Sequence, residues 1–345
     1  MLSAPLNIHW ELTNRCNLRC IHCYQQDDER DAVMPSASLL SIIAHRIADA
    51  SVFELTLTGG EIMMVKQLPW LLDFFNERGI EPHVTSNGTL VSERRADELA
   101  ARRLTFQVSI DSADPSVHDG VRQKRGALAR AVRGIERLVE RGVSVSVAYT
   151  CMPQNADSVP GVLELAERIG VHKVCVGEVL PYFGGRSQRT QMTRSTEATT
   201  NAHNRLLALV DAYAGRIDLK LAFQGVETDD PVPKRQSCTA LDRDLAILHD
   251  GSAYPCPFVR KAAYRLGSVV DTPIRELWSC AAAERFRREK TELHVFHCRL
   301  EAEPTDSSAG SLLPMLQPAN VRSTSVISSA ERSLAQDFDA SSASS

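Results

Sequence analysis

The chain has 345 residues, 43% of them hydrophobic, which is enough for one large domain or for a large domain with a small appendage. Its formal net charge of −4 gives no general attraction to polyanions, so neither nucleic acid nor an anionic membrane is an expected partner. No apolar run approaches the roughly 20 residues that span a bilayer, and no signal peptide pattern opens the chain, so we expect a cytoplasmic protein.

Short β-rich runs alternate with helical patterns along the first half of the chain. The expected strands are 7–12, 54–58, 82–86, 105–110, 144–149 and 173–177. The expected helices are 37–50, 67–78, 92–102, 128–141 and 159–169. Three of these helices are followed by a glycine that suits a helix C-cap, namely Gly79, Gly142 and Gly170.

Six βα units predict parallel strands joined by right-handed crossovers. Periodicity alone leaves open whether such strands curl into a barrel or lie in an open sheet, but in both cases ligands gather at the carboxyl ends of the strands. We expect an α/β fold, a partial (β/α)6 TIM-like barrel, over residues 1–185. Residues 186–235 are expected to be a linker with one helix from about 202 to 214, and 301–345 a disordered tail rich in Ser and Ala.

Three cysteines stand close together directly after the first strand. Cys16, Cys20 and Cys23 form a Cys-x3-Cys-x2-Cys motif, and nine cysteines in a reducing compartment indicate metal ligation better than disulfides. Three thiolates so close together can bind three irons of one cubane and leave the fourth iron without a protein ligand. The alternatives are a zinc site, which normally needs four ligands, and cysteines that serve only structure.

This motif, preceded by WELTNR and followed by Tyr24, resembles the radical S-adenosylmethionine (radical SAM) superfamily over roughly residues 6–180. The resemblance implies a [4Fe–4S] cluster on Cys16, Cys20 and Cys23, with S-adenosylmethionine chelating the open iron. One electron then cleaves a carbon–sulfur bond and makes a 5′-deoxyadenosyl radical.

Further motifs follow the second, third and fourth strands. Gly59 and Gly60 are expected to let the backbone approach a ligand and to leave N–H groups free, and the resemblance places Glu61 at the methionine amino group. It also implies that Ser109 and Asp111, with Asn87, lie near S-adenosylmethionine. The alternative for each of these three is strand-end capping or turn formation.

A charged stretch, DPSVHDGVRQKRGA, resembles a loop of many family members. A cation in it is expected to pair with the methionine carboxylate, and Arg122 is preferred over Arg125. The alternative is a solvated run of charges.

A second cysteine region, 236–300, is expected to hold a hairpin that turns at 249–251 between Cys238 and Cys256. With YPCP and LGSVVDTPIRELW, it resembles the SPASM and twitch domains, which bind auxiliary iron–sulfur clusters. The resemblance implies Cys238, Cys256 and Cys298 as ligands of an auxiliary [4Fe–4S] cluster. The Cys-x2-Cys pair of those domains is replaced by Cys298-Arg-Leu-Glu301, so one thiolate is missing, and structural cysteines on a hairpin are the alternative.

The resemblance implies a radical SAM enzyme that abstracts hydrogen during maturation of a ribosomally synthesised peptide or protein. The alternatives are radical modification of a small metabolite, such as an aminoglycoside or haem precursor, and a metal-binding homologue that has lost catalysis. Expected partners are the substrate and an electron donor such as flavodoxin or ferredoxin. Six residues before the first strand leave no room for a leader-peptide domain, so a partner protein or direct recognition is expected for a peptide.

Overall fold

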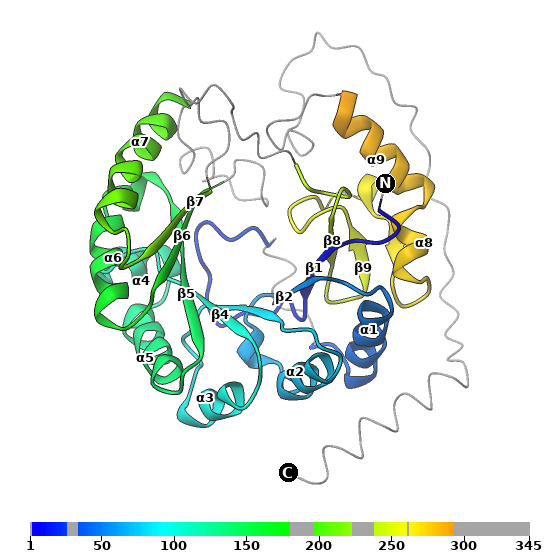
Figure 1. Cartoon of the computed structure of the whole chain (residues 1–345), viewed down its shortest axis with the longest axis horizontal. Coiled ribbons are helices and arrows are strands. Elements are labelled where there is room, and N and C mark those ends of the chain that lie inside the picture. Colours follow the sequence, from blue (N-terminus) through cyan, green and yellow to red (C-terminus); the bar gives the residue numbers. More distant parts are fainter. Residues whose placement is uncertain (1, 26–33, 180–195, 223–237, 261, 293–345) are drawn as a thin grey trace.

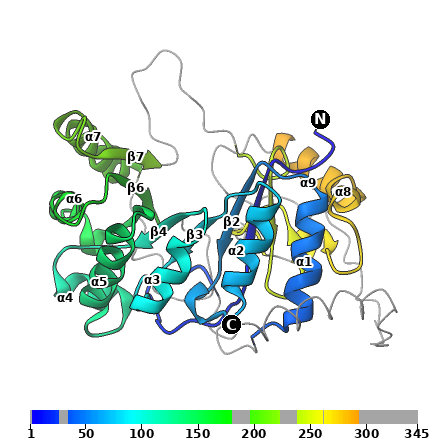
Figure 2. The same cartoon turned by 60° about the horizontal axis from the view of Figure 1, so that its bottom comes forward.

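The computed structural model describes residues 2–25, 34–179, 196–222, 238–260 and 262–292. In these ranges the strands form one sheet that curves into an open arc, and the helices cover its outer face (Figure 1). Figure 2 shows the same helices from below, standing side by side along the outside of the sheet.

The strand order in the sheet is β10-β9-β8-β1-β2-β3-β4-β5-β6-β7. Neighbours from β8 to β7 are parallel, whereas β8, β9 and β10 pair antiparallel. The strands are β1 (Asn7–Glu11), β2 (Glu54–Thr58), β3 (His83–Ser86), β4 (Thr105–Ser109), β5 (Ser144–Cys151), β6 (Lys173–Glu178), β7 (Asp218–Ala222), β8 (Asp244–Ile247), β9 (Ser252–Tyr254) and β10 (Gly267–Ser268).

Most of the described helices follow the strands as the apolar spacing predicts, whereas α4, α8 and α9 were not predicted. They are α1 (Ala37–Asp49), α2 (Leu68–Glu77), α3 (Glu93–Ala100), α4 (Pro115–Arg122), α5 (Ala127–Glu140), α6 (Val159–Arg168), α7 (Thr196–Ala212), α8 (Ile274–Trp278) and α9 (Ala281–Glu292). In α5, for example, the buried Leu128, Ala131, Ile135 and Leu138 recur every three or four residues and form one apolar stripe.

The expected α/β partial barrel is confirmed, and the six expected strands differ from the observed ones by two residues at most. Gly79, Gly142 and Gly170 all adopt the left-handed conformation of a helix C-cap. The structure adds β7, which the sequence did not predict, and α7 begins at Thr196 rather than near 202. The expected tail, 301–345, lies outside the described residues.

The C-terminal hairpin confirms the expected turn at 249–251, and Gly251 there has a φ of +84°. Its first strand, β8, pairs parallel with β1 from Asn7 opposite Asp244 to Trp10 opposite Ile247. The hairpin therefore extends the barrel sheet past β1 instead of forming a sheet of its own.

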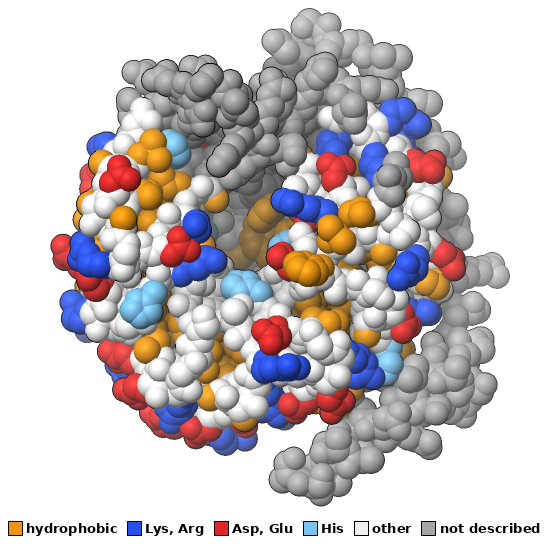
Figure 3. Space-filling view, in the orientation of Figure 1, with side chains coloured by type: hydrophobic (Ala, Val, Ile, Leu, Met, Phe, Trp, Pro, Cys, Tyr) orange, Lys and Arg blue, Asp and Glu red, His pale blue; other side chains and the backbone are white. Residues whose placement is uncertain are grey.

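The two faces of the strands differ in polarity because successive side chains point to opposite sides. Buried apolar residues such as Trp10, Leu57 and Phe106 face the helices. The inner face carries partly exposed polar side chains, among them His9, Thr56, Thr58, His83, Thr85 and Gln107. Figure 3 shows a hollow at the centre of this view, with histidine side chains at its border.

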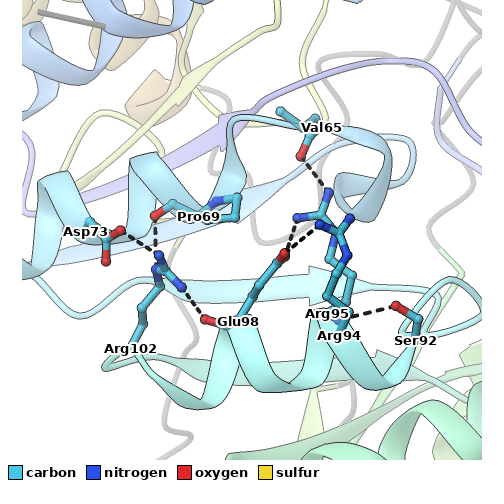
Figure 4. Close-up of polar contacts among 8 residues, drawn as sticks. All are labelled: Val65, Pro69, Asp73, Ser92, Arg94, Arg95, Glu98 and Arg102. Atoms are coloured by element: carbon cyan, nitrogen blue, oxygen red, sulfur yellow. Dashed lines mark hydrogen bonds and ion pairs between the residues drawn. The ribbon is translucent and has the colours of Figure 1, made fainter. Parts of the chain in front are cut away.

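Arginine side chains join neighbouring outer helices. Arg102, two residues after the end of α3, forms a 2.6 Å ion pair with Asp73 of α2 and donates to the carbonyl of Pro69 (Figure 4). Arg95 forms a 2.8 Å ion pair with Glu98 on the same helix. Among the described residues, no helix has the length and apolar character that crossing a bilayer requires.

Because β8 pairs with β1, a cavity created in the packing of β8 is expected to make local opening of β1 more frequent as well. Replacing the fully buried Leu245 by alanine should lower the free energy of unfolding by about 2 to 5 kcal/mol. Hydrogen exchange should then become faster at the β1 amides. Phe53→Ala is the control, because Phe53 is 81% exposed and its loss should change stability by about 0.5 kcal/mol at most. Unchanged exchange in β1 would show that the hairpin opens by itself.

Candidate functional site

The segment after β1 crosses the carboxyl ends of the neighbouring parallel strands. Asn17 donates to Thr89 Oγ1 beyond β3 (2.9 Å), and the Ile21 N–H donates to the Val121 carbonyl in α4 (3.0 Å). We call residues 13–24 the cysteine loop, because it contains Cys16, Cys20 and Cys23. It lies at the edge of the sheet where parallel α/β folds bind ligands.

Nitrogen donors already point at two of the three sulfur atoms. Cys16 Sγ accepts from the Leu18 N–H (3.4 Å) and from Asn87 Nδ2 (3.9 Å). Cys20 Sγ accepts from Arg122 Nη1 (3.6 Å). Burial raises the pKa of the Cys16 thiol to about 12, to which the nearby thiols of Cys20 and Cys23 contribute. Burial also raises the pKa of Cys20, against the opposing charge of Arg122.

A single zinc ion and a cubane cluster need different spacings of their thiolate ligands. Ligands of a single zinc lie about 2.3 Å from it and hence within about 4 Å of one another. No three His, Cys, Asp or Glu side chains in the described ranges are grouped closely enough for such an ion. In a cubane each thiolate binds its own iron, so the thiolates stand farther apart.

The glycine pair after β2 is the support on which the cysteine loop lies. A Cβ on Gly59, which has a φ of +152°, would stand 2.4 Å from the Thr13 carbonyl oxygen, and one on Gly60 would stand 2.3 Å from that of Arg15. The N–H groups of Gly60 and Glu61 donate to these same carbonyls, at 2.7 and 2.9 Å. The expectation of free N–H groups is therefore wrong for these two amides. The absence of a Cβ at the two glycines lets the backbone of the cysteine loop, and not a ligand, approach closely.

Glu61 is buried with only 1% of its surface exposed. Its Oε1 accepts from Ser86 Oγ (2.6 Å) and the Met63 N–H (3.0 Å), and its Oε2 accepts from the Asn87 N–H (2.8 Å). Burial raises the pKa of Glu61 against the effect of these donors. Glu61 thus connects the turn after β2 to the end of β3 and to Asn87, which reaches Cys16.

Arg122 lies on a helix and not on the expected loop. Asp114 caps α4 by accepting from the Ser116 N–H (2.7 Å), Pro115 begins the helix, and Gln123 ends it in a left-handed conformation. The helix places His118 and Arg122 one turn apart on its buried side.

Asp111 and Arg122 form a buried ion pair with 2.7 Å between Oδ2 and Nε. Burial opposes ionisation of Asp111, but the charge of Arg122 prevails and the pKa of Asp111 is lowered. Arg122 in turn has a raised pKa, since Asp111 and Cys20 outweigh its burial. Ser109, at the end of β4, is half-buried on the inner face, whereas Arg125 is exposed. The structure brings Asn87, Asp111 and Arg122 together around the cysteine loop.

The second cysteine group is only partly within the described residues. Cys238 precedes β8, and Cys256 follows β9; both are half-buried. Cys298 lies outside the described residues. Cys280 precedes α9, and its Sγ lies 3.8 Å from the Leu266 carbonyl. The auxiliary ligand set stays a prediction.

A contact that was not predicted from the sequence joins the two cysteine regions. Tyr24 Oη donates to Glu11 Oε1 (3.2 Å), and Arg260 forms an ion pair with the same carboxylate. Arg260 also lies over the Tyr24 ring, 5.0 Å from its centroid. Burial raises the pKa of Tyr24, so its hydroxyl remains a donor. In the sequence, the position of Tyr24 directly after Cys23 was the one sign that Tyr24 lies at the site. The ion pair could not be predicted, because Glu11 and Arg260 are far apart in the sequence.

Comparison with known proteins supports this reading of the fold. The model of the radical SAM superfamily matches residues 10–166, and that of an iron–sulfur cluster-binding domain, SPASM, matches residues 238–299. Mycofactocin maturase MftC of Mycobacterium ulcerans is 30% identical over 292 residues, 84% of this chain and 78% of that protein. Fe-coproporphyrin III synthase of Methanosarcina barkeri is 30% identical over 201 residues; the match covers 57% of this chain and half of that synthase.

A solved structure has the same fold. SuiB of Streptococcus suis bound to its precursor peptide SuiA matches with a TM-score of 0.68 and 16% identity, over 84% of this chain and 67% of that one. The fold and the cysteine loop define an iron–sulfur protein of the radical SAM class. The chain belongs to the radical SAM superfamily, in the group with a C-terminal SPASM domain.

Membership implies a [4Fe–4S] cluster and S-adenosylmethionine as cofactors, and the SPASM domain implies auxiliary iron–sulfur clusters. The cysteine loop fits such a cluster. It supplies three thiols, and N–H donors to Cys16 and Cys20 favour their thiolate forms.

A side chain at position 60 is expected to displace the cysteine loop. Gly60→Ala would place its Cβ 2.3 Å from the Arg15 carbonyl oxygen, and overpacking of this kind should cost about 3 kcal/mol. Gly120→Ala is the matched control, because no atom lies within 4 Å of its Cβ and alanine favours the helix by about 1 kcal/mol. Denaturant unfolding measures both, and equal stability of the two variants would contradict the proposed support.

His118 should make stability depend on pH. It is buried, its Nδ1 accepts from the Asp111 N–H (3.1 Å), and burial lowers its pKa from 6.5 to about 4. As the pH falls from about 6.5 to about 4, the unfolded chain binds a proton that the folded chain does not, so stability is lost in this window, by roughly 3 kcal/mol. Denaturant unfolding should show a shallower slope for His118→Gln, and identical slopes would contradict this assignment.

Proposed function

We propose that this chain is a radical SAM enzyme that abstracts hydrogen from a residue of a ribosomally synthesised peptide or protein. The observation that carries the proposal is the cysteine loop over the strand ends, with N–H donors on two of its sulfurs. With Cys16, Cys20 and Cys23 as its ligands, the cluster supplies one electron that cleaves S-adenosylmethionine to a 5′-deoxyadenosyl radical. The domain boundaries proposed are 1–185 for the core and 236–300 for the auxiliary region.

Glu61, with Gly59 and Gly60, has the role of receiving the methionine amino group. Glu61 Oε2 accepts one hydrogen bond from within the chain, and a carboxylate oxygen can accept two, which supports this role. Ser109 and Asn87 contribute polar groups at the ends of β4 and β3. Each lies at the same edge of the sheet as the cysteine loop.

Arg122 is proposed to bind the methionine carboxylate. Its Nε is paired with Asp111 and its Nη1 donates to Cys20. A guanidinium has five N–H groups, so three stay available for an anion. Asp111 keeps the guanidinium in place and lowers the cost of burying its charge.

A peptide substrate is supported by the polar inner face of the sheet. The interior of a closed TIM barrel is filled by branched apolar side chains. Here His9, His83 and Gln107 are partly exposed on the inner face, and within the described part of the chain the edge strands β7 and β10 do not pair with each other to close the barrel. A polar, open trough suits an extended chain with many backbone groups to satisfy. The peptide bound to SuiB and the maturase name of MftC support the same class.

A small metabolite is the second candidate substrate. The similarity to Fe-coproporphyrin III synthase over 57% of this chain favours it. A peptide substrate would use direct recognition or a leader-binding partner protein, and either substrate needs a one-electron donor such as flavodoxin or ferredoxin.

Anaerobically reconstituted and reduced protein should release 5′-deoxyadenosine from S-adenosylmethionine. The Cys16→Ala, Cys20→Ala, Cys23→Ala triple variant should lose this release by more than about a hundredfold, because the open iron is lost, yet keep iron at the auxiliary site. Cys175→Ala, a half-buried thiol in β6, is the control that should keep both. Zinc in place of iron, or release by the triple variant, would contradict the proposal.

The substrate class is tested by coexpression with a candidate precursor peptide. Mass spectrometry should find a loss of hydrogen or a new cross-link in the peptide, absent with the triple variant. Conversion of a porphyrin precursor with an unchanged peptide would favour the second candidate.

A further inference from the structure

Three side chains from three distant parts of the chain meet beside the cysteine loop. Glu11 ends β1, Tyr24 directly follows Cys23, and Arg260 lies four residues after Cys256. Tyr24 Oη donates to Glu11 Oε1, and Arg260 Nη2 forms an ion pair with the same oxygen. The two cysteine regions are thus in contact through one carboxylate.

The contact is buried and has more than one component. Glu11 is 1% exposed and the Arg260 side chain 9%. Phe258 packs edge-on against the Tyr24 ring at 5.6 Å, and the Arg260 guanidinium lies over the same ring. The segment from Cys256 to Arg260 therefore contacts Tyr24 in two ways, through the packed ring of Phe258 and through the charge of Arg260.

Glu11 cannot keep this arrangement without its cation. A buried carboxylate that loses an oppositely charged neighbour either takes up a proton or moves toward water. Its Oε2 has no hydrogen-bond partner among the described residues, so the ion pair at Oε1 carries most of the compensation. Because Tyr24 is bonded to the same Oε1, a change at Arg260 reaches the residue next to Cys23.

We propose that Arg260 is a positioning residue that makes the geometry of the cysteine loop depend on the loop beginning at Cys256. Ligand binding at Cys256 moves or fixes the segment 256–260, and the Arg260–Glu11–Tyr24 contact passes this change to Cys23. The role of Cys23 as a cluster ligand rests on the function proposed above, whereas the mechanical link between the two loops does not.

The link is tested first without any cluster. In the metal-free full chain, iodoacetamide should alkylate Cys23 about tenfold faster in Arg260→Ala than in the wild type, because the loop opens more often. Mass spectrometry of the peptide containing Cys23 gives the rate. Arg260→Lys should fall between the two, since it restores the charge without the planar group. Arg265→Ala is the matched control: Arg265 donates to Ser252 Oγ in the same hairpin and should leave the rate unchanged.

The second test uses reconstituted protein. Tyr24→Phe removes one hydrogen bond and keeps the ring, so it should fold even where Arg260→Ala does not. Both variants should bind iron like the wild type but need about tenfold more S-adenosylmethionine to change the electron paramagnetic resonance spectrum of the reduced cluster. Arg260→Lys should restore part of this difference.

The two proposals fail in different ways. Wild-type alkylation rates and wild-type spectra in Arg260→Ala and Tyr24→Phe would overturn the positioning role and leave the proposed function intact. A wild-type protein without iron would overturn the proposed function, while faster alkylation in Arg260→Ala would still support the link between the loops.

Discussion

The site depends on the close contact between two backbone segments, the start of the cysteine loop and the glycine pair after β2. Two hydrogen bonds, from the Gly60 and Glu61 N–H groups to the carbonyls of Thr13 and Arg15, keep the chain close to the sheet edge as it leaves β1. No residue with a Cβ fits at either glycine without moving this backbone. The loop then crosses to α4, so its three thiols lie above the strand ends, where the polar side chains of several strands converge.

Around this contact, buried charges are balanced in pairs rather than exposed to water. Asp111 neutralises Arg122, and Arg122 also faces Cys20. Glu61 is compensated by three hydrogen-bond donors and by the charge of Arg122, but burial outweighs them and its pKa rises, whereas the ion pair with Arg122 lowers the pKa of Asp111. Such preorganised groups need little rearrangement when a charged ligand arrives.

Most of the barrel could be predicted from the sequence because each βα unit repeats a local pattern. Apolar periodicity and C-cap glycines gave the strands and helices to within a few residues. Prediction from local patterns fails where contacts between distant residues determine the structure. Helix α4 looked like a charged loop, since its buried face contains His118 and Arg122 beside Val121, and the burial of Arg122 depends on Asp111 and Cys20. The glycine pair was recognised, but its partner, the backbone after β1, could not be read from the sequence.

The position of the C-terminal hairpin gives the chain its second constraint. Since β8 pairs parallel with β1, the hairpin is fixed next to the strand from which the cysteine loop departs. The segments that carry Cys23 and Cys256 are therefore in contact. Glu11 and Arg260, which form the ion pair between them, are 249 residues apart in the sequence. At the other edge of the arc, β7 pairs with β6 alone among the described strands. Beyond β1 the sheet continues through β8, which places the second cysteine region beside the first. At β7 the sheet is open, so its polar inner face can be reached by a substrate.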